Sequence, residues 1–164
     1  MVVDFINLDI DFAFFGSVDA VFCCIGTTIK QAGSEAAFQV VDYEIPMSIA
    51  RLARAAGCGS FFLISSSKAS SDSIFFYLQV KGRLEDDLSL LGFDRLVVYR
   101  PALLAGKRSS FRFFEYIMGC LFRWFSFMIP KKYNVIDAND LATKMVENYH
   151  HGVDGAYVIE RECM

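Results

Sequence analysis

Residues 20–28, AVFCCIGTT, join a short apolar run to a small polar loop that begins at Gly26. An uninterrupted apolar run of this length, closed by a glycine, is typical of a strand that is buried on both faces of a parallel sheet. Residues 61–64 and 95–100 repeat the pattern, the first leading into serines and the second ending at Pro101. Segments with helical periodicity lie between these runs. The alternation predicts an α/β fold with a doubly wound parallel sheet.

The first long helix is expected to begin after Asp42, whose side chain can cap it, and to end before Gly57, which can adopt a positive φ. We expect this start rather than one at Glu35, because Pro46 then lies near the first turn, where proline does little harm.

Further elements complete the pattern. A second helix is predicted over residues 74–91, where Arg83 and Asp87 are spaced to form an ion pair and Gly92 ends the helix. The other expected elements are one or two helices in 111–127, an extended piece at 133–136, a helix over 141–149 capped by Asn139 or Asp140, and a last strand at 155–159.

Composition excludes several classes of protein. The chain has 164 residues, of which 54% are hydrophobic and 21% charged, so most of it is not disordered. Its length, without a linker or repeat, predicts a single domain over residues 1–164. A net charge of −3 argues against broad nucleic-acid binding, which takes clustered positive charge. Five cysteines without a CxxC pair predict no metal site or disulfide framework, and favour a reducing compartment such as the cytoplasm.

Residues 111–129 are the most aromatic part of the chain. Arg112, Glu115 and Arg123 interrupt this segment, so it falls short of a spanning helix, which takes about 20 mostly apolar residues. One interpretation is docking to a membrane surface or a partner protein. The favoured interpretation is the wall of a substrate cavity or a core helix.

A tyrosine and a lysine four residues apart are the sharpest chemical feature. Tyr77 and Lys81 lie on the second predicted helix, and their spacing puts them on one face, one turn apart. An ammonium beside a phenol favours the phenolate, which makes Tyr77 a usable proton donor and acceptor. Ser65 follows a strand, at the edge where open α/β sheets bind ligands, and can donate a hydrogen bond to a substrate carbonyl. The alternative is a surface lysine, a packed tyrosine and a serine loop that only turns the chain.

Gly26 and Thr27 form a second candidate site after the first strand. A glycine lets a ligand approach the backbone, and the neighbouring hydroxyl can bond a phosphate or a ribose. A plain turn is the alternative that these residues alone favour.

Five segments together resemble the Tat-interacting protein family of atypical short-chain dehydrogenases/reductases. They are VVDF, DAVFCCIGTT, FFLISSSKAS, FFYLQVKGRLEDDL and FDRLVVYRPALL. The resemblance runs from near Val2 through about Arg112, and CCIGTT followed by YLQVKG is much more specific than a YxxxK pattern alone. It implies a Rossmann-like fold, NADPH as cofactor and a carbonyl substrate of unknown identity.

The resemblance also implies a role for each candidate residue. Tyr77 would be the proton donor and acceptor, Lys81 would hold the ribose hydroxyls, and Ser65, with Ser66, would orient the substrate carbonyl. The positions that would line the cofactor are Gly26, Thr27, Tyr77, Lys81, Arg100, Pro101, Leu104 and Arg112, the last suited to a phosphate.

The sequence departs from the family pattern at its start. The family opens with a strand, a glycine-rich phosphate loop, a helix and a second strand, whereas no GxxGxxG precedes Gly26. We therefore expect an N-terminally truncated form, such as a short isoform, that binds NADPH weakly or not at all. Without those strands, residues 20–24 should form an apolar sheet edge.

Three functions stay open at this point. The first is an NADPH-dependent oxidoreductase, impaired in this form. The second is a non-catalytic regulatory protein, whose partners the resemblance places in transcription, nuclear import or apoptosis. The third is a peripheral membrane protein that docks by its aromatic segment. A cytoplasmic location is expected, with the nucleus or a membrane surface as alternatives.

Overall fold

A computed structural model describes residues 18–101, 104–105 and 136–160 of the chain. Its centre is a sheet of four parallel strands in the order β1-β2-β3-β6, which confirms the predicted α/β class. In register, Phe61 of β2 lies between Val21 of β1 and Leu96 of β3. The strands are β1 (Ala20–Cys23), β2 (Ser60–Ile64), β3 (Arg95–Arg100) and β6 (Gly155–Glu160).

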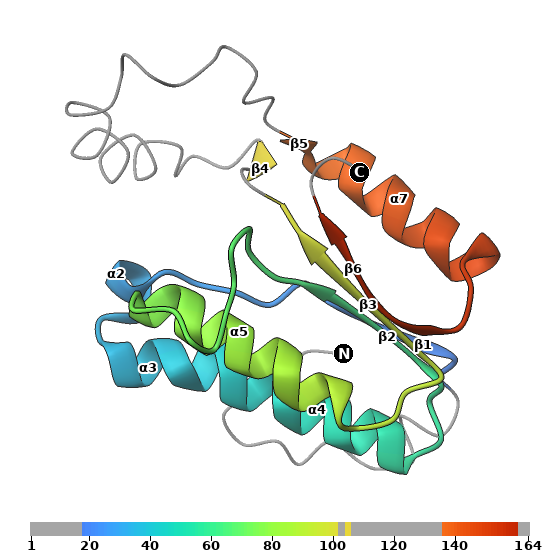
Figure 1. Cartoon of the computed structure of the whole chain (residues 1–164), viewed down its shortest axis with the longest axis horizontal. Coiled ribbons are helices and arrows are strands. Elements are labelled where there is room, and N and C mark those ends of the chain that lie inside the picture. Colours follow the sequence, from blue (N-terminus) through green and yellow to red (C-terminus); the bar gives the residue numbers. More distant parts are fainter. Residues whose placement is uncertain (1–17, 102–103, 106–135, 161–164) are drawn as a thin grey trace.

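Helices cover both faces of this sheet (Figure 1). The helices α4 (Ile45–Ala55) and α5 (Phe76–Ser89) cover one face, where Phe61 and Leu63 are buried. The helix α7 (Ala138–His151) covers the other face, where it packs on Phe62. Successive residues of β2 therefore serve opposite cores, as the twofold period of a strand requires.

The first long helix begins earlier than expected. The helix α3 (Glu35–Gln39) starts after Ser34, whose hydroxyl accepts the N–H of Ala37 at 3.1 Å. It continues through a π-helical turn, η1 (Val40–Glu44), into α4. The expected start at Asp42 is wrong, because Ser34 supplies the cap. Pro46, which has no N–H to donate, is the second residue of α4, just past the wider turn. A short helix, α2 (Ile29–Ala32), precedes α3.

The expected ion pair between Arg83 and Asp87 on α5 is not formed. Asp87 instead accepts the hydroxyl proton of Tyr43 at 2.5 Å, and this bond raises the pKa of Tyr43. The guanidinium of Arg83 lies over the ring of Tyr43, 5.2 Å from its centroid. Tyr43, which lies in the π-helical turn, thus interacts with both Asp87 and Arg83 in place of the expected ion pair. Gly92 follows α5 with a φ of 70°, as predicted.

The last helix begins at Ala138 and not after Asn139 or Asp140. Asp137 is its cap, and the carboxylate of Asp137 accepts the N–H of Asn139 at 2.7 Å. Asp137 also belongs to β5 (Ile136–Asp137), which pairs in parallel with β4 (Leu104–Ala105) as a separate small sheet.

The strand β1 is an edge of the described sheet, as expected. Its Phe22 is 40% exposed, although the ring stacks on Phe62 with centroids 4.6 Å apart. The prediction that this strand is buried on both faces is therefore wrong for Phe22, which lies at the edge of the face that α7 covers.

The aromatic segment 111–129, with its predicted helices, lies outside the described residues. Within the described ranges, no helix is both long enough and apolar enough to cross a bilayer.

Candidate active site

The parallel strands bring three loops to one edge of the sheet. The loop after β1 carries Gly26 and Thr27, the loop after β2 begins at Ser65, and Pro101 follows β3. The loop after β2, residues 65–75, is called the serine loop. It is hydrogen-bonded to β3, because the N–H of Ser65 donates to the carbonyl oxygen of Tyr99 at 2.8 Å. These loops lie at the carboxyl ends of the strands, where open α/β sheets bind ligands.

Lys81 reaches the first of these loops from α5. Its ammonium lies 2.7 Å from Oδ1 of Asp42, and the two side chains are 5% and 0% exposed. The other carboxylate oxygen of Asp42 accepts the backbone N–H of Thr27 at 2.8 Å. A Cβ added to Gly26 would lie 3.7 Å from Nζ of Lys81, so the loop backbone and the ammonium are close neighbours. Asp42, expected to cap a helix, instead links the π-helical turn to the loop and to Lys81.

Tyr77 lies in the first turn of α5, one turn before Lys81. Its ring is half-buried and packs against Phe38 of α3, with the two centroids 5.4 Å apart. Within the described part of the chain, the Tyr77 hydroxyl has no hydrogen-bond partner. Among these residues, no side chain or backbone group therefore fixes the direction of the hydroxyl.

Ser65 takes part in a charged network. Its hydroxyl donates to Oε1 of Glu85, which is 7% exposed. The guanidinium of Arg100 lies 2.6 Å from Oε2 of Glu85 and 2.9 Å from Oε1 of Glu160. The hydrogen bonds to Glu85 raise the pKa of Arg100, so this side chain stays charged. The network joins α5 to the ends of β2, β3 and β6.

The close approach of α5 to the serine loop depends on Gly82. A Cβ at this position would lie 2.1 Å from the carbonyl carbon of Ser70 and 2.2 Å from the nitrogen of Ser71. The N–H of Ser70 also donates to the carbonyl oxygen of Leu78 at 3.1 Å. In the same loop, the hydroxyl of the half-buried Ser66 makes a long contact of 3.5 Å with a backbone oxygen and has no other partner among the described residues.

The predicted residues thus gather in two groups at one sheet edge. The first consists of the loop after β1 with Lys81 and Asp42, and the second of Ser65, Glu85 and Arg100. Of the other predicted residues, Tyr77 lies on α5 one turn before Lys81, Ser66 follows Ser65, Pro101 is buried after β3, Leu104 lies in β4, and Arg112 is outside the described residues.

Sequence reasoning missed both acids of these groups. Glu85 comes four residues after Lys81, on the helix face that also carries Tyr77, and this spacing is the signal that could have identified it. Asp42 gave a weaker signal, because an acid near the start of an apolar helical segment also fits a cap.

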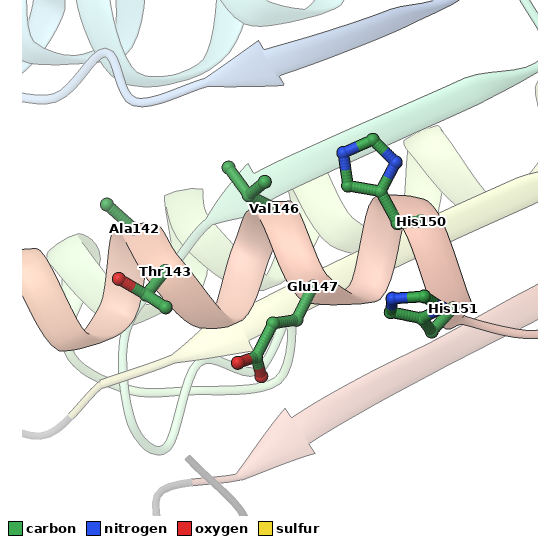
Figure 2. A pocket seen from close by; sticks show the side chains of 6 residues that line it. All are labelled: Ala142, Thr143, Val146, Glu147, His150 and His151. Carbon is green, nitrogen blue, oxygen red and sulfur yellow. The ribbon is translucent and has the colours of Figure 1, made fainter.

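A shallow groove lies on α7, away from these groups (Figure 2). It is lined by Ala142, Thr143, Val146, Glu147, His150 and His151. Across the described ranges, no cluster of three or more His, Cys, Asp or Glu side chains could hold a metal ion.

The chain is similar to several known proteins. No family model matches it. Over 111 residues it is 45% identical to protein HTATIP2 of Rattus norvegicus, a match that covers 68% of the chain and 46% of that protein. Over 98 residues it is 46% identical to the mitochondrial protein FMP52 of Meyerozyma guilliermondii, covering 59% and 42%. The chain belongs with the Tat-interacting protein family. It spans less than half the length of these curated relatives.

Solved structures show the same fold at low sequence identity. RMD from Pseudomonas aeruginosa, complexed with NADPH, has a TM-score of 0.65 at 17% identity, covering 98% of this chain and 65% of that one. The dTDP-4-dehydrorhamnose reductase of Bacillus anthracis, in complex with NADP, has a TM-score of 0.64 at 17% identity, covering 96% and 64%. WbmH from Bordetella bronchiseptica, in complex with NAD+, has 0.61 at 18%, covering 91% and 56%. The Rossmann-like fold is confirmed.

The expected location needs correction. The FMP52 relatives from Meyerozyma, Scheffersomyces, Debaryomyces and Candida are all named mitochondrial proteins. These names contradict the cytoplasmic or nuclear location inferred from the cysteines and the resemblance. The inference failed because reduced thiols do not distinguish between these compartments.

Proposed function

We propose that the chain acts in NADPH-dependent carbonyl reduction with the tyrosine and lysine chemistry of short-chain dehydrogenases/reductases. The observation that carries the proposal is the buried Lys81 ammonium, which lies beside the Gly26 loop on the helix that also presents Tyr77. The family assignment and the nicotinamide dinucleotides bound by the structural neighbours support a cofactor of this class.

The residues at the first loop fit the ribose of such a cofactor. Gly26 is exposed and has no side chain, so a ligand can approach its backbone, and Thr27 adds a hydroxyl. The Lys81 ammonium has three N–H donors, more than its ion pair with Asp42 can use. Arg100, Pro101, Leu104 and Arg112 keep their proposed cofactor-lining role from the resemblance.

NADPH, when bound, supplies the hydride for the carbonyl carbon. Tyr77 gives its hydroxyl proton to the carbonyl oxygen, so that an alcohol results, and recovers a proton from solvent. Lys81 keeps positive charge near the phenolate that forms. Asp42 holds the ammonium in place at 2.7 Å.

The two serines take different parts in this scheme. A hydroxyl has a single proton to donate, and Ser65 directs its own to Glu85. Ser66, whose hydroxyl makes only a 3.5 Å contact, is free to donate to the substrate carbonyl. Ser65 then orients the carbonyl indirectly, by fixing the loop.

The test is NADPH consumption with phenanthrenequinone as a probe carbonyl. Tyr77→Phe is expected to lower kcat by about 10²- to 10⁴-fold, because the proton donor is lost. Tyr157→Phe removes a hydroxyl from β6, away from the site, and is expected to leave kcat unchanged. Equal turnover in the wild type and Tyr77→Phe would refute the proposal. A folded chain without turnover would favour the non-catalytic regulatory protein.

A further inference from the structure

The carboxylate of Glu85 receives hydrogen bonds from two sides. Ser65 donates to Oε1, while Arg100 donates to Oε2 from Nε at 3.1 Å and from Nη2 at 2.6 Å, and its Nε also makes a longer contact of 3.3 Å with Oε1. Glu85 is 7% exposed, so solvent contributes little to its hydrogen bonding. We propose that Glu85 is a positioning residue, which fixes the direction of the Ser65 hydroxyl and thereby the serine loop; this inference rests on the proposed function.

The direction of the hydroxyl follows from the chemistry of the partners. An ionised carboxylate only accepts hydrogen bonds, so the proton between Ser65 and Glu85 belongs to the serine. Arg100 balances the buried charge and is itself held by Glu160 at 2.9 Å. A buried carboxylate without these donors would be strongly disfavoured, so the serine proton is held in place.

The backbone fixes the same serine from the other side. The N–H of Ser65 donates to the carbonyl oxygen of Tyr99 at 2.8 Å, and the N–H of Ser67 donates to that of Pro101 at 3.2 Å. The main chain of the loop is therefore attached to the end of β3, whereas the Ser65 side chain is attached to Glu85 of α5. Ser66 lies between these two hydrogen-bonded residues, so the backbone of the loop determines where its hydroxyl points.

A purely structural role for Glu85 makes a different prediction. If the carboxylate only neutralised Arg100, Glu85→Gln and Glu85→Ala would be equally harmful, because both remove the charge. If Glu85 positions Ser65, Glu85→Gln keeps an oxygen that can accept a hydrogen bond from the Ser65 hydroxyl, whereas Glu85→Ala does not. The pair of variants therefore separates the two roles.

The first measurement uses phenanthrenequinone and NADPH with the complete chain. Glu85→Ala is expected to lower kcat by about tenfold with little change in KM for NADPH, and Ser65→Ala to lower it similarly. The double variant should be no slower than either single variant, since both remove one interaction. Glu85→Gln should retain most of the activity, although both Glu85 variants lower the melting temperature. Asp86→Asn, an exposed neighbour, is the control.

The second measurement does not need turnover. In NMR spectra of the folded chain, the Cβ and amide resonances of Ser65 are expected to move in Glu85→Ala, to move less in Glu85→Gln, and to stay in place in Asp86→Asn. Unmoved Ser65 resonances in Glu85→Ala would overturn the inference, as would equal loss of kcat in Gln and Ala variants. If the wild type shows no turnover, the proposed function fails, and the NMR comparison still decides whether Glu85 holds Ser65.

Discussion

Burial of the charged Lys81 side chain costs desolvation free energy, which a close counter-charge offsets. The lysine and Asp42 are separated by 39 residues (81 minus 42) in sequence, yet their charged atoms lie 2.7 Å apart beneath the loop after β1. Breaking such a pair leaves an uncompensated buried charge, which is typically more harmful than never having had the pair. The sequence predicted the position of the lysine from its spacing to Tyr77, but the partner depends on the tertiary packing of η1 against α5.

Removal of the acid should therefore destabilise the fold. Asp42→Asn keeps an acceptor for the Thr27 N–H but leaves Lys81 without a counter-charge, and we expect the free energy of unfolding to fall by about 3 kcal/mol. Urea denaturation measures this change. Asp86→Asn, exposed on α5, should stay within about 0.5 kcal/mol of the wild type. If Asp42→Asn is as stable as Asp86→Asn, the pair has no structural role.

The vicinal cysteines at the end of β1 differ in environment. Desolvation by burial raises the pKa of Cys23 to about 11, whereas Cys24 is exposed, although desolvation also raises its pKa. A raised pKa leaves little thiolate at neutral pH, so both react slowly and Cys23 more slowly.

Alkylation with iodoacetamide at pH 8, followed by peptide sequencing, should find Cys24 modified well before Cys23. The same shift predicts that stability falls as the pH rises from about 9 towards 11, because the unfolded thiol loses its proton while the folded one keeps it. Modification of Cys23 as fast as Cys24 in the folded chain would show that the strand end is open.

At the scale of elements, helix starts were harder to predict than strands. β3 was predicted with its observed bounds, because an apolar run ended by proline is a local signal. The start of α3 was missed although Ser34 precedes it. A helix starting after Asp42 was expected instead, because it would place Pro46 in the first turn. The π-helical turn lets one helix run from the cap at Ser34 past Pro46. This turn packs against α5, a tertiary contact that cannot be predicted from a single sequence.

The glycine of α5 gives a test of element packing. Gly82→Ala would improve helix propensity by about 1 kcal/mol, but its Cβ would meet backbone atoms 2.1 Å away in the serine loop. We expect net destabilisation of about 1–3 kcal/mol, measured by thermal or urea unfolding. Gly26→Ala is the comparison, because its Cβ would meet only side-chain atoms, the nearest at 3.4 Å. A Gly82→Ala variant more stable than the wild type would contradict the packing described here.

At the scale of the whole molecule, the strand pattern was enough to predict a parallel sheet with helices on both faces. It was also enough to place Gly26, Ser65 and Pro101 at one edge, because parallel strands share a carboxyl end. The pairings within the two charged groups at that edge were not predictable, since Asp42, Glu85 and Glu160 come from three separate elements. Contacts of this kind appear only when the fold is assembled.

A dinucleotide needs a partner for its pyrophosphate as well as for its ribose. The 164 residues contain no GxxGxxG motif, the glycine-rich sequence that the family resemblance places at the pyrophosphate. We therefore expect residues 1–164 to bind NADPH more weakly than micromolar. The reduced nicotinamide mononucleotide, which has a ribose but no pyrophosphate, should bind almost as well as NADPH.

We propose that the loop after β1 and Lys81 hold the nicotinamide ribose beside Tyr77. The most direct measurement is an NMR titration of the chain with reduced nicotinamide mononucleotide at millimolar concentration. We predict that the amide resonances of Gly26, Thr27, Ser66 and Tyr77 move together, and that Lys81→Met abolishes these changes. Resonances that stay in place at the sheet edge, or that move only along the α7 groove around Val146, would contradict the claim.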